Sequence, residues 1–498
     1  MTDGTPPHVV IVGGGIAGLA AAFFLKDEPV TVTLLEGSPR LGGKLSASEV
    51  AGVPMDEGAE ALLARRPEGI DLITATGLGA DLVSAGVTSS AIFTRGAMRP
   101  LPRRQFMGVP ADIDELAATG VVSAEGVARA RREPALPAEP GDVSVTAYIG
   151  ARLGAEIVDR LVDPLLGGVY AGRSEDLSFA ATLAPLAAAA ARHRVLTEAA
   201  ASLIPPSAPA PAVPAAPTTP APAPTTPAPA PPPTPGDNSK RPPAAPVFVT
   251  LTTGLGALPE VLAKASNADV RTGAMVRDLA RTQDGWRLTV GSAADPEYLR
   301  ADAVIIAIPA APASRLLSRT VPAASSALSE IPYASMAIIT LAYPADRFPG
   351  QARSGYLVPA VDGKAVKAVT FSTVKWPHLA AHAPVHVVRC SIGRTGEVAL
   401  LQRDDDDLAA LGAAELADAT GITAAPVARR VTRWGGGLPQ YNVGHLDRVA
   451  RIREAVAGQP GLAVAGAAYD GVGIPACIAT ARSAADRVLR HLETVRKR

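Results

Sequence analysis

The chain has 498 residues, 48% of them hydrophobic, so two or three domains with buried cores are expected. Lysine plus arginine equals aspartate plus glutamate at 47 each, so overall charge gives no reason to expect binding to nucleic acid or to an anionic membrane surface. The two cysteines, Cys390 and Cys477, are too few for a disulfide framework or a zinc site, and no apolar stretch is long enough to span a bilayer, so a cytoplasmic protein without a metal is expected.

The first predicted elements are a strand, a glycine turn, a helix and a second strand. An apolar, β-branched run precedes Gly13, an apolar helix follows Gly18, and Glu36 closes the second strand. Gly13 permits a tight turn, Gly15 lets the backbone approach a pyrophosphate, and Gly18 lets the helix lie close to the strand. Glu36 can accept from a ribose hydroxyl, and the helix amino terminus attracts phosphate. The segment predicts a site for the ADP half of a dinucleotide; a plain glycine connector is the alternative.

The middle of the chain divides into a helical region, a proline-rich insertion and a series of strands. Alanine- and leucine-rich spacings of three and four predict amphipathic helices between residues 144 and 201. Residues 205–246 hold 18 of the 47 prolines and predict an extended or disordered linker or surface insertion. The later runs with strand patterns cover 247–249, 286–290, 303–308, 336–343, 355–358, 366–371, 385–390 and 462–465. A closing helix is expected over 476–492.

A second glycine turn with a cation follows the ribose acid. Residues 40–44 (RLGGK) resemble the E-x-x-x-R-x-G-G-[RK] continuation of the amine-oxidase and porphyrinogen-oxidase superfamily of flavoproteins. Residues 56–61 (DEGAEA) are similar to that superfamily's D-x-G-x segment beside the isoalloxazine ring, and an ordinary surface turn is the alternative. Residues 465–475 resemble its terminal motif, in which a helix amino terminus would stabilise negative charge on the reduced ring. The resemblance implies FAD as the cofactor.

Three motifs narrow the resemblance to the protoporphyrinogen and coproporphyrinogen oxidases. Residues 164–172 (PLLGGVYAG), with DLS at 176–178, resemble the GV[FY]AG…LS signature of that family. Residues 434–445 (WGGGLPQYNVGH) and 469–475 (YDGVGIP) are similar to two further family segments. Glu60 and Ala476 stand where the family often has aspartate, which leaves a side-chain role at Ala476 open. The composition resembles that of the actinobacterial members.

The resemblance implies an α/β fold with a Rossmann-like FAD-binding domain, an inserted mixed-sheet substrate domain and a mainly helical region. Sequence elements of the nucleotide type at both ends of the chain agree with a cofactor domain built from discontinuous pieces. The expected FAD-binding pieces are 1–85, 247–318 and 431–498. The substrate and helical domain would cover 86–204, the insertion 205–246, and the substrate-domain sheet 319–430.

The resemblance also implies the residues that would contact FAD. They belong to the dinucleotide turn, the ribose acid, the flavin segment and the terminal motif: Gly13, Gly14, Gly15, Ile16, Ala17, Gly18, Glu36, Gly37, Lys44, Gly58, Ala59, Glu60, Ala61, Val276, Trp434, Val472, Gly473 and Ile474. Val276 would contact adenine through its backbone. Trp434 is the one tryptophan of three that is expected in a glycine-rich turn, and a core aromatic is the alternative for it.

The substrate that the resemblance implies is a porphyrinogen, a macrocycle of four pyrroles joined by saturated carbons and carrying propionates. The candidate catalytic group is the Gly168 backbone carbonyl, which would lie near the bridging carbons or the pyrrole N–H groups. Leu357 would pack on the macrocycle or, equally, belong to the core of a sheet. Arg65, Arg66 and Arg95 are candidates for binding propionates because guanidinium pairs bidentately with carboxylate, a solvated face being the alternative.

Three histidines have spacings that could suggest a metal site. Pro377 and Pro384 disfavour a single helix that presents His378, His382 and His386 together, so loop and strand positions are expected for them. No Ser-His-Asp or Cys-His constellation is evident, which agrees with cofactor-driven chemistry.

The implied activity is FAD-dependent, oxygen-consuming, six-electron oxidation of coproporphyrinogen III to coproporphyrin III in haem biosynthesis, with release of hydrogen peroxide. A chain without a membrane segment suits the tetra-acidic copro form better than the divinyl proto form. The alternatives are protoporphyrinogen IX oxidation, an FAD-dependent amine oxidase or desaturase, and a porphyrin or flavin carrier without turnover. A contact with a ferrochelatase is left open.

Overall fold

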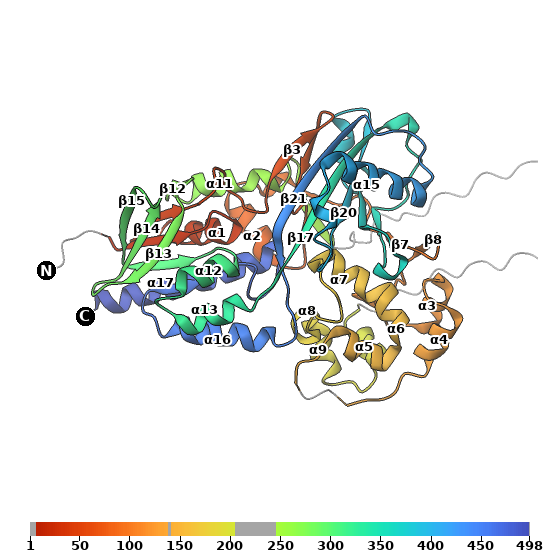
Figure 1. Ribbon diagram of the computed structural model, residues 1–498, viewed down its shortest axis with the longest axis horizontal. Coiled ribbons are helices and arrows are strands. Elements are labelled where there is room, and N and C mark those ends of the chain that lie inside the picture. Colours follow the sequence, from red (N-terminus) through yellow and green to blue (C-terminus); the bar gives the residue numbers. More distant parts are fainter. Residues whose placement is uncertain (1–5, 138–140, 205–245, 498) are drawn as a thin grey trace, which may run out of the picture.

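The computed structural model describes residues 6–137, 141–204 and 246–497. The chain forms two lobes, and both of its ends lie at the outer end of one of them (Figure 1). The predicted insertion at 205–246 lies outside the described residues except for Pro246.

A five-stranded parallel sheet forms the centre of the first lobe. Its strand order is β12-β2-β1-β16-β22. The bounds are β12 Asp269–Arg271, β2 Thr31–Leu35, β1 His8–Val12, β16 Ala303–Ile306 and β22 Leu462–Val464. Buried valine and isoleucine fill β1 and β16 on both faces, which is typical of a parallel sheet covered on both sides. Segments far apart in the sequence therefore share one sheet.

Helices and a small antiparallel sheet cover the two faces of this parallel sheet. Val9 and Ile11 of β1 point to one face, where the helices are α1 Ile16–Leu25, α2 Pro67–Ala75, α11 Leu258–Ala265 and α17 Ile474–Arg496. Val10 and Val12 point to the other face, which is covered by β13 Val276–Arg281, β14 Trp286–Gly291, β15 Pro296–Ala301, α12 Ala310–Leu317, α13 Pro322–Ser329 and α16 His445–Ala457. Alternate residues of β1 therefore belong to two different hydrophobic cores.

A seven-stranded mixed sheet forms the upper part of the second lobe (Figure 1). In sheet order the strands are β21 Ala428–Pro439, β17 Tyr333–Pro344, β20 Val385–Ile392, β19 Val366–Phe371, β18 Gly355–Leu357, β7 Ser90–Thr94 and β8 Ala97–Pro100. Helix α15, Asp405–Thr420, covers one face. The Asp404 carboxylate accepts from the Asp407 amide at 2.8 Å and caps that helix, so the acidic run is a helix start.

Short helices form the lower part of the second lobe. Their bounds are α3 Ile113–Thr119, α4 Ala124–Arg131, α5 Val145–Leu153, α6 Ala155–Ile157, α7 Asp163–Tyr170, α8 Phe179–Thr182, α9 Ala184–Ala190 and α10 Leu196–Ser202. A π-helical turn, Val158–Val162, joins α6 to α7. The core of this part also contains Tyr441, and Leu357 of β18 and Val472 pack against it, so it touches both the large sheet and the first lobe.

Smaller elements complete the structure. They are β3 Ala47–Val50 with β4 Val53–Asp56, the trio β5 Leu62–Leu63, β11 Phe248–Leu251 and β6 Leu82–Ser84, the pair β9 Gln105–Phe106 and β10 Val109–Pro110, and α14 Ser372–Lys375. None of the helices within the described ranges combines the length and the apolar character needed to cross a membrane.

The predicted helices between residues 144 and 201 and the predicted strands are confirmed. The environment of Trp434 is a correction, because this residue lies within strand β21 and opposite Met336 of β17, not in a turn. Strand β21 is an edge strand, and an edge strand tolerates the run of three glycines that follows Trp434. Residues 431–439 consequently extend the large sheet, although the expected boundary grouped them with 440–498.

Candidate functional site

The turn between β1 and α1 is built for close approach to an anion. A Cβ on Gly18 would lie 1.8 Å from the Gly13 carbonyl oxygen, so only glycine lets the helix lie this close to the strand. A Cβ on Gly15 would meet no atom within 4 Å, which leaves open space beside the helix start. Gly15 bridges to Gly42 of the second glycine turn, and no described residue accepts a hydrogen bond from the amides of Gly15 or Ala17. These free donors, and a first turn without an acidic residue, suit a pyrophosphate.

The predicted ribose acid lies at the end of β2, beside this turn. Both oxygens of the Glu36 carboxylate are fixed, since the Gly14 amide donates to Oε2 and the Ser38 amide to Oε1, each at 2.7 Å. Gly37 lies against Met275, the residue before Val276 at the start of β13. The structure therefore brings the predicted ribose and adenine contacts together at one end of the sheet.

Lys44 lies where the second glycine turn meets the start of α17. Its ammonium group interacts with the Cys477 thiol in the first turn of that helix, and burial lowers the pKa of Lys44. Burial also raises the pKa of Cys477 to about 11, so this thiol is neutral. A Cβ on Gly58 would lie 1.9 Å from the Lys44 carbonyl oxygen, which ties the turn to segment 56–61. Lys44 thus places a buried amine near the start of α17.

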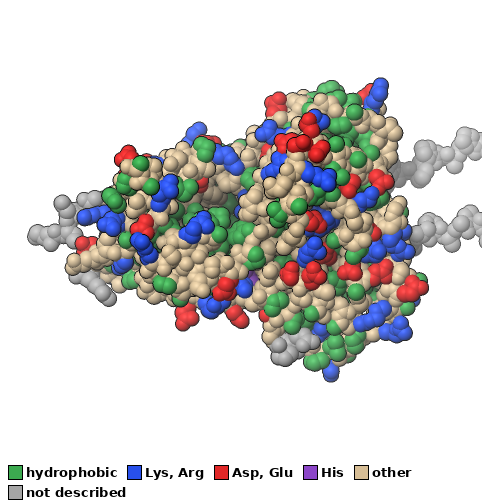
Figure 2. Space-filling model, viewed as in Figure 1, with side chains coloured by type: hydrophobic (Ala, Val, Ile, Leu, Met, Phe, Trp, Pro, Cys, Tyr) green, Lys and Arg blue, Asp and Glu red, His purple; other side chains and the backbone are tan. Residues whose placement is uncertain are grey.

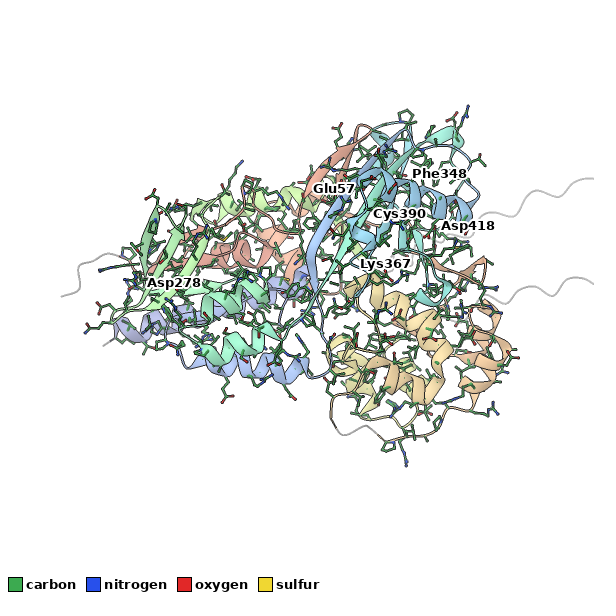
Figure 3. The ribbon with its side chains drawn as sticks, in the orientation of Figure 1. Glu57, Asp278, Phe348, Lys367, Cys390 and Asp418 are labelled. Atoms are coloured by element: carbon green, nitrogen blue, oxygen red, sulfur yellow. The ribbon has the colours of Figure 1, made fainter. Side chains whose placement is uncertain are left out.

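Segment 56–61 is fixed from the large sheet by buried contacts. The Trp434 indole donates to the Glu57 carbonyl oxygen at 2.9 Å, and Glu57 itself lies beside β21 (Figure 3). Lys375 and Arg389 both pair with the Glu60 carboxylate, the former at 2.6 Å. Burial alone would raise the pKa of Glu60, but these two cations outweigh burial and hold its pKa at about 2. Glu60 is a permanent anion whose partners are protein side chains.

The environment of Asp56, at the start of this segment, is different. Its carboxylate accepts from the amides of Leu255 at 2.9 Å and Gly256 at 2.8 Å. Burial raises the pKa of Asp56 to about 6 in spite of these two donors. Asp56 therefore ties segment 56–61 to the start of α11 and is the group in this segment that titrates near neutral pH.

The terminal motif forms a loop, residues 466–473, between β22 and α17. Gly473 precedes the first turn of α17, which has no acidic residue and no side-chain cap, and no described residue accepts from the amides of Gly473 or Ile474. The side chain of Val472 packs against the helical core of the second lobe. The loop therefore presents a second helix start with free donors, in contact with the helical part of the second lobe.

The predicted substrate residues fall into two groups. Gly168 lies exposed in the last turn of α7, and a Cβ on it would lie 3.6 Å from the Leu357 side chain. No described residue donates to the Gly168 carbonyl. The structure therefore brings Gly168 and Leu357 together, with a free acceptor beside an apolar side chain.

The three arginines proposed for propionates do not converge. Arg65 and Arg66 are exposed before α2 in the first lobe, and Arg66 pairs with Glu68 at 2.6 Å. Arg95 is exposed in the turn of the β7–β8 hairpin, in the second lobe (Figure 1). The solvated-face alternative therefore describes Arg95 best.

The histidine prediction is confirmed. His378 lies in the 3₁₀ turn Pro377–Ala381, His382 follows that turn, and His386 lies on β20. Within the described parts of the chain, no cluster of histidine, cysteine, aspartate or glutamate has the grouping of a metal site.

Two pairs of residues that sequence reasoning missed lie around the site. Lys375 and Arg389 reach Glu60 from α14 and β20, and Gln440 and Tyr441 contact both lobes. The quoted 434–445 motif contains Gln440 and Tyr441, so a signal existed for them, whereas the sequence around Lys375 and Arg389 carried none.

The predicted cofactor residues lie around one region of the first lobe that continues towards the second lobe. The face shown in Figure 2 is hollowed between the lobes, and hydrophobic side chains lie in the hollow. The open space beside Gly15, the free amides of two helix starts and the nearby Lys44 fit a dinucleotide whose far end reaches segments 56–61 and 472–474. Fold and site together define a flavoprotein oxidoreductase of the Rossmann type.

Comparisons with known proteins agree with this assignment. Residues 16–489 match the family described as flavin containing amine oxidoreductase. The chain is 31% identical to the coproporphyrinogen III oxidase of Bacillus subtilis, with 99% of this chain and 100% of that protein covered. It is 34% identical to the coproporphyrinogen III oxidase of Mycobacterium tuberculosis, with 98% and 99% covered. A crystal structure from Exiguobacterium, of a protein provisionally named a protoporphyrinogen oxidase, superposes with a TM-score of 0.80 at 29% identity over 98% of this chain and 99% of that one.

The chain belongs to the flavin-containing amine oxidoreductase family. Its cofactor is FAD, and it is an FAD-dependent oxidoreductase.

Proposed function

We propose that this chain oxidises coproporphyrinogen III to coproporphyrin III in haem biosynthesis, in the cytoplasm and with oxygen as the final acceptor. The observation that carries the proposal is the similarity over nearly the whole chain to two proteins named for that activity. The contact between Gly168 and Leu357 supports it, because it puts a free carbonyl beside an apolar side chain where the helical part of the second lobe meets the large sheet.

The reaction removes six hydrogens from the macrocycle in three two-electron steps, and each step would reduce one oxygen molecule to hydrogen peroxide. Bound FAD supplies the two-electron acceptor. The chain would hold FAD through the eighteen residues given above, with the α1 amino terminus and Lys44 compensating the pyrophosphate charge.

On the substrate side, the chain would act mainly by position. The Gly168 carbonyl would accept from a pyrrole N–H and hold the bridging carbons towards the cofactor, and Leu357 would exclude water from the macrocycle face. Arg65 and Arg66 remain the proposed propionate anchors, since their exposed guanidinium groups suit carboxylates at the mouth of a pocket. A ferrochelatase that takes up the product belongs to the same proposal.

The test is turnover by the purified full-length protein. Its visible flavin absorption is checked first, and porphyrin fluorescence is then followed with coproporphyrinogen III, protoporphyrinogen IX or an amine under oxygen. We expect coproporphyrinogen III to form fluorescent porphyrin with the highest kcat/KM of the three substrates. About three molecules of hydrogen peroxide should form for each porphyrin, because the oxidation takes three two-electron steps. Faster turnover of protoporphyrinogen would redirect the proposal, and no porphyrin from either substrate would overturn it.

A further inference from the structure

One short segment contacts both halves of the proposed reaction site. Residues 438–445 leave the end of β21 and lead into α16. On one side they reach the carboxyl end of α7, which carries Gly168, and on the other the loop 466–473 at the start of α17. Neither Gln440 nor Tyr441 is among the residues proposed to contact cofactor or substrate.

The Tyr441 hydroxyl closes the loop 466–473 with two hydrogen bonds. It donates to the Ala467 carbonyl oxygen at 2.6 Å and accepts from the Gly471 amide at 2.8 Å. Tyr441 is only 2% exposed, so water does not replace these bonds readily. Gly471 has φ of 143°, a conformation that other residues rarely adopt, so the loop backbone depends on being held. One buried hydroxyl therefore fixes both ends of the turn before Val472.

The Tyr441 ring is itself fixed from two directions. It stacks on His445 with a centroid distance of 3.8 Å and an interplanar angle of 13°, and it lies 5.5 Å from the Tyr170 ring at the end of α7. His445 Nε2 lies 3.2 Å from the Tyr469 carbonyl oxygen, to which it donates in the tautomer that carries its proton there. Burial lowers the pKa of His445 to about 4, so the imidazole stays neutral at pH 7. Through its ring contact with Tyr170, the Tyr441 hydroxyl is held in place relative to the end of α7.

The neighbouring residue holds α7 directly. Gln440 Nε2 donates to the Tyr170 carbonyl oxygen at 2.7 Å, and Thr395 donates to Gln440 Oε1 at 3.2 Å. A Cβ on Gly172 would lie 2.3 Å from that amide oxygen, so a larger residue there would displace the Gln440 side chain. Two consecutive side chains, Gln440 and Tyr441, thus bind the end of α7 and the loop that precedes α17.

We propose that Tyr441 is a positioning residue whose hydroxyl holds the loop 466–473, and with it the amino terminus of α17, at a fixed place relative to α7. The proposal rests on the proposed function, because it assigns the two helix ends to FAD and to a porphyrinogen. Tyr441 touches neither reactant and acts through the Gly471 and Ala467 backbone. Reaction rates are sensitive to such placement, since an error of about 1 Å can cost about a hundredfold in rate.

The test compares Tyr441→Phe with the wild-type protein. The ring and its stacking on His445 stay, and only the hydroxyl is lost. We expect hydrogen exchange in peptides covering 466–473 to accelerate about tenfold in both flavin-free and FAD-loaded protein, because the hydroxyl accepts from the Gly471 amide and its removal loosens the loop. We also expect kcat to fall at least tenfold with KM for the porphyrinogen within twofold, and the flavin reduction potential to fall because the helix terminus is held less firmly.

Tyr469→Phe is the matched control for exchange. The Tyr469 hydroxyl is buried and has no partner among the described residues, and its ring packs in the core of the first lobe. Its removal is expected to leave exchange of 466–473 unchanged. Gln440→Leu should instead loosen α7 and raise KM, with loop exchange within twofold of the wild type.

The outcomes separate the two proposals. Unchanged exchange over 466–473 in a folded Tyr441→Phe protein overturns the positioning role, as does an equal acceleration in Tyr469→Phe. If Tyr441→Phe does not fold, Tyr441→Trp is tested in its place, because it keeps an aromatic ring and a donor. Hydrogen exchange over 466–473 must then accelerate in Tyr441→Trp, or the positioning role is rejected. If wild-type protein forms no porphyrin, the proposed activity fails, while exchange in flavin-free protein and the reduction potential still decide the role of Tyr441.

Discussion

At the residue scale, the structure contains buried charged side chains whose contributions to stability can be measured. Lys367 on β19 is 4% exposed and lies between the large sheet and α7 (Figure 3), and its ammonium donates to the Gly393 carbonyl oxygen at 2.8 Å. Burial, with the nearby Arg394 charge, lowers the pKa of Lys367 to about 7, although Glu397 opposes the shift. A bulge at this point of β19 turns the residue inward.

The lowered pKa of Lys367 predicts that the free energy of unfolding rises with pH. The folded state releases the Lys367 proton near pH 7 and the unfolded chain near 10.5, so between these values the unfolded chain binds more protons. The free energy of unfolding should therefore increase by about 1.4 kcal/mol per pH unit above pH 7 from this group. Urea unfolding of wild type and Lys367→Met at pH 7, 8 and 9 measures the effect, and the variant should lack the rise.

The partly exposed Lys364 is the matched control for Lys367. Its ion pair with Asp418 at 2.8 Å raises its pKa, so Lys364→Met should keep the wild-type slope. A slope that persists in Lys367→Met would assign it to another group.

Glu60 is a second buried charge with a measurable role. Glu60→Ala would leave Lys375 and Arg389 facing each other without an anion, and breaking a buried pair in this way costs about 3–5 kcal/mol. Glu68→Ala breaks the more exposed pair with Arg66 and should cost less than about 1 kcal/mol. Denaturant unfolding of the two variants checks the difference. A loss in Glu60→Ala as small as that in Glu68→Ala would show that the cations rearrange.

At the element scale, glycines with different surroundings separate folding from cofactor binding. Gly15→Ala adds a methyl group to open space at a permitted φ of −75°, so the flavin-free protein should unfold at the wild-type temperature. The same methyl group occupies the place proposed for pyrophosphate, so FAD affinity should fall at least about tenfold, or about 1.4 kcal/mol. Flavin fluorescence titration and thermal unfolding measure the two effects.

Gly18→Ala is the contrasting variant. Its methyl group would lie 1.8 Å from the Gly13 carbonyl oxygen, so α1 must move away from β1 and both stability and FAD affinity should fall. Equal effects in Gly15→Ala and Gly18→Ala would contradict the assignment of the open space beside Gly15 to the cofactor.

The sequence predicted elements well where each has its own periodicity. The alternating and continuous apolar runs of β1, β14, β16 and β20 and the spacing in α17 identify these elements without tertiary information. Trp434 was misplaced because a glycine run usually marks a turn, and only the edge position of β21 allows it in a strand. The contacts of Glu60 with Lys375 and Arg389 span more than 300 residues of sequence, so no local pattern could indicate them.

At the scale of the whole molecule, the proposed FAD site joins parts that are distant in sequence. The α1 turn, Trp434 and the start of α17 come from both ends of the chain and from both lobes. A ligand that binds only the folded state stabilises it by about 2.7 kcal/mol at a hundred times its dissociation constant. FAD loading should therefore raise the unfolding temperature of both lobes together, as differential scanning calorimetry can show. A shift in one of two separate transitions would mean that FAD does not bridge the lobes.

The order of strands in the parallel sheet has a consequence for synthesis of the protein. Strand β1 pairs with β2 on one side, but its other neighbour, β16, begins at Ala303. At about 5–20 residues per second, roughly 15–60 s of translation separate the two strands. During that time β1 has an unpaired, apolar edge, the kind of edge that recruits other chains. A nascent chain of this protein should therefore depend on chaperones until its second half emerges, and its isolated first half should aggregate.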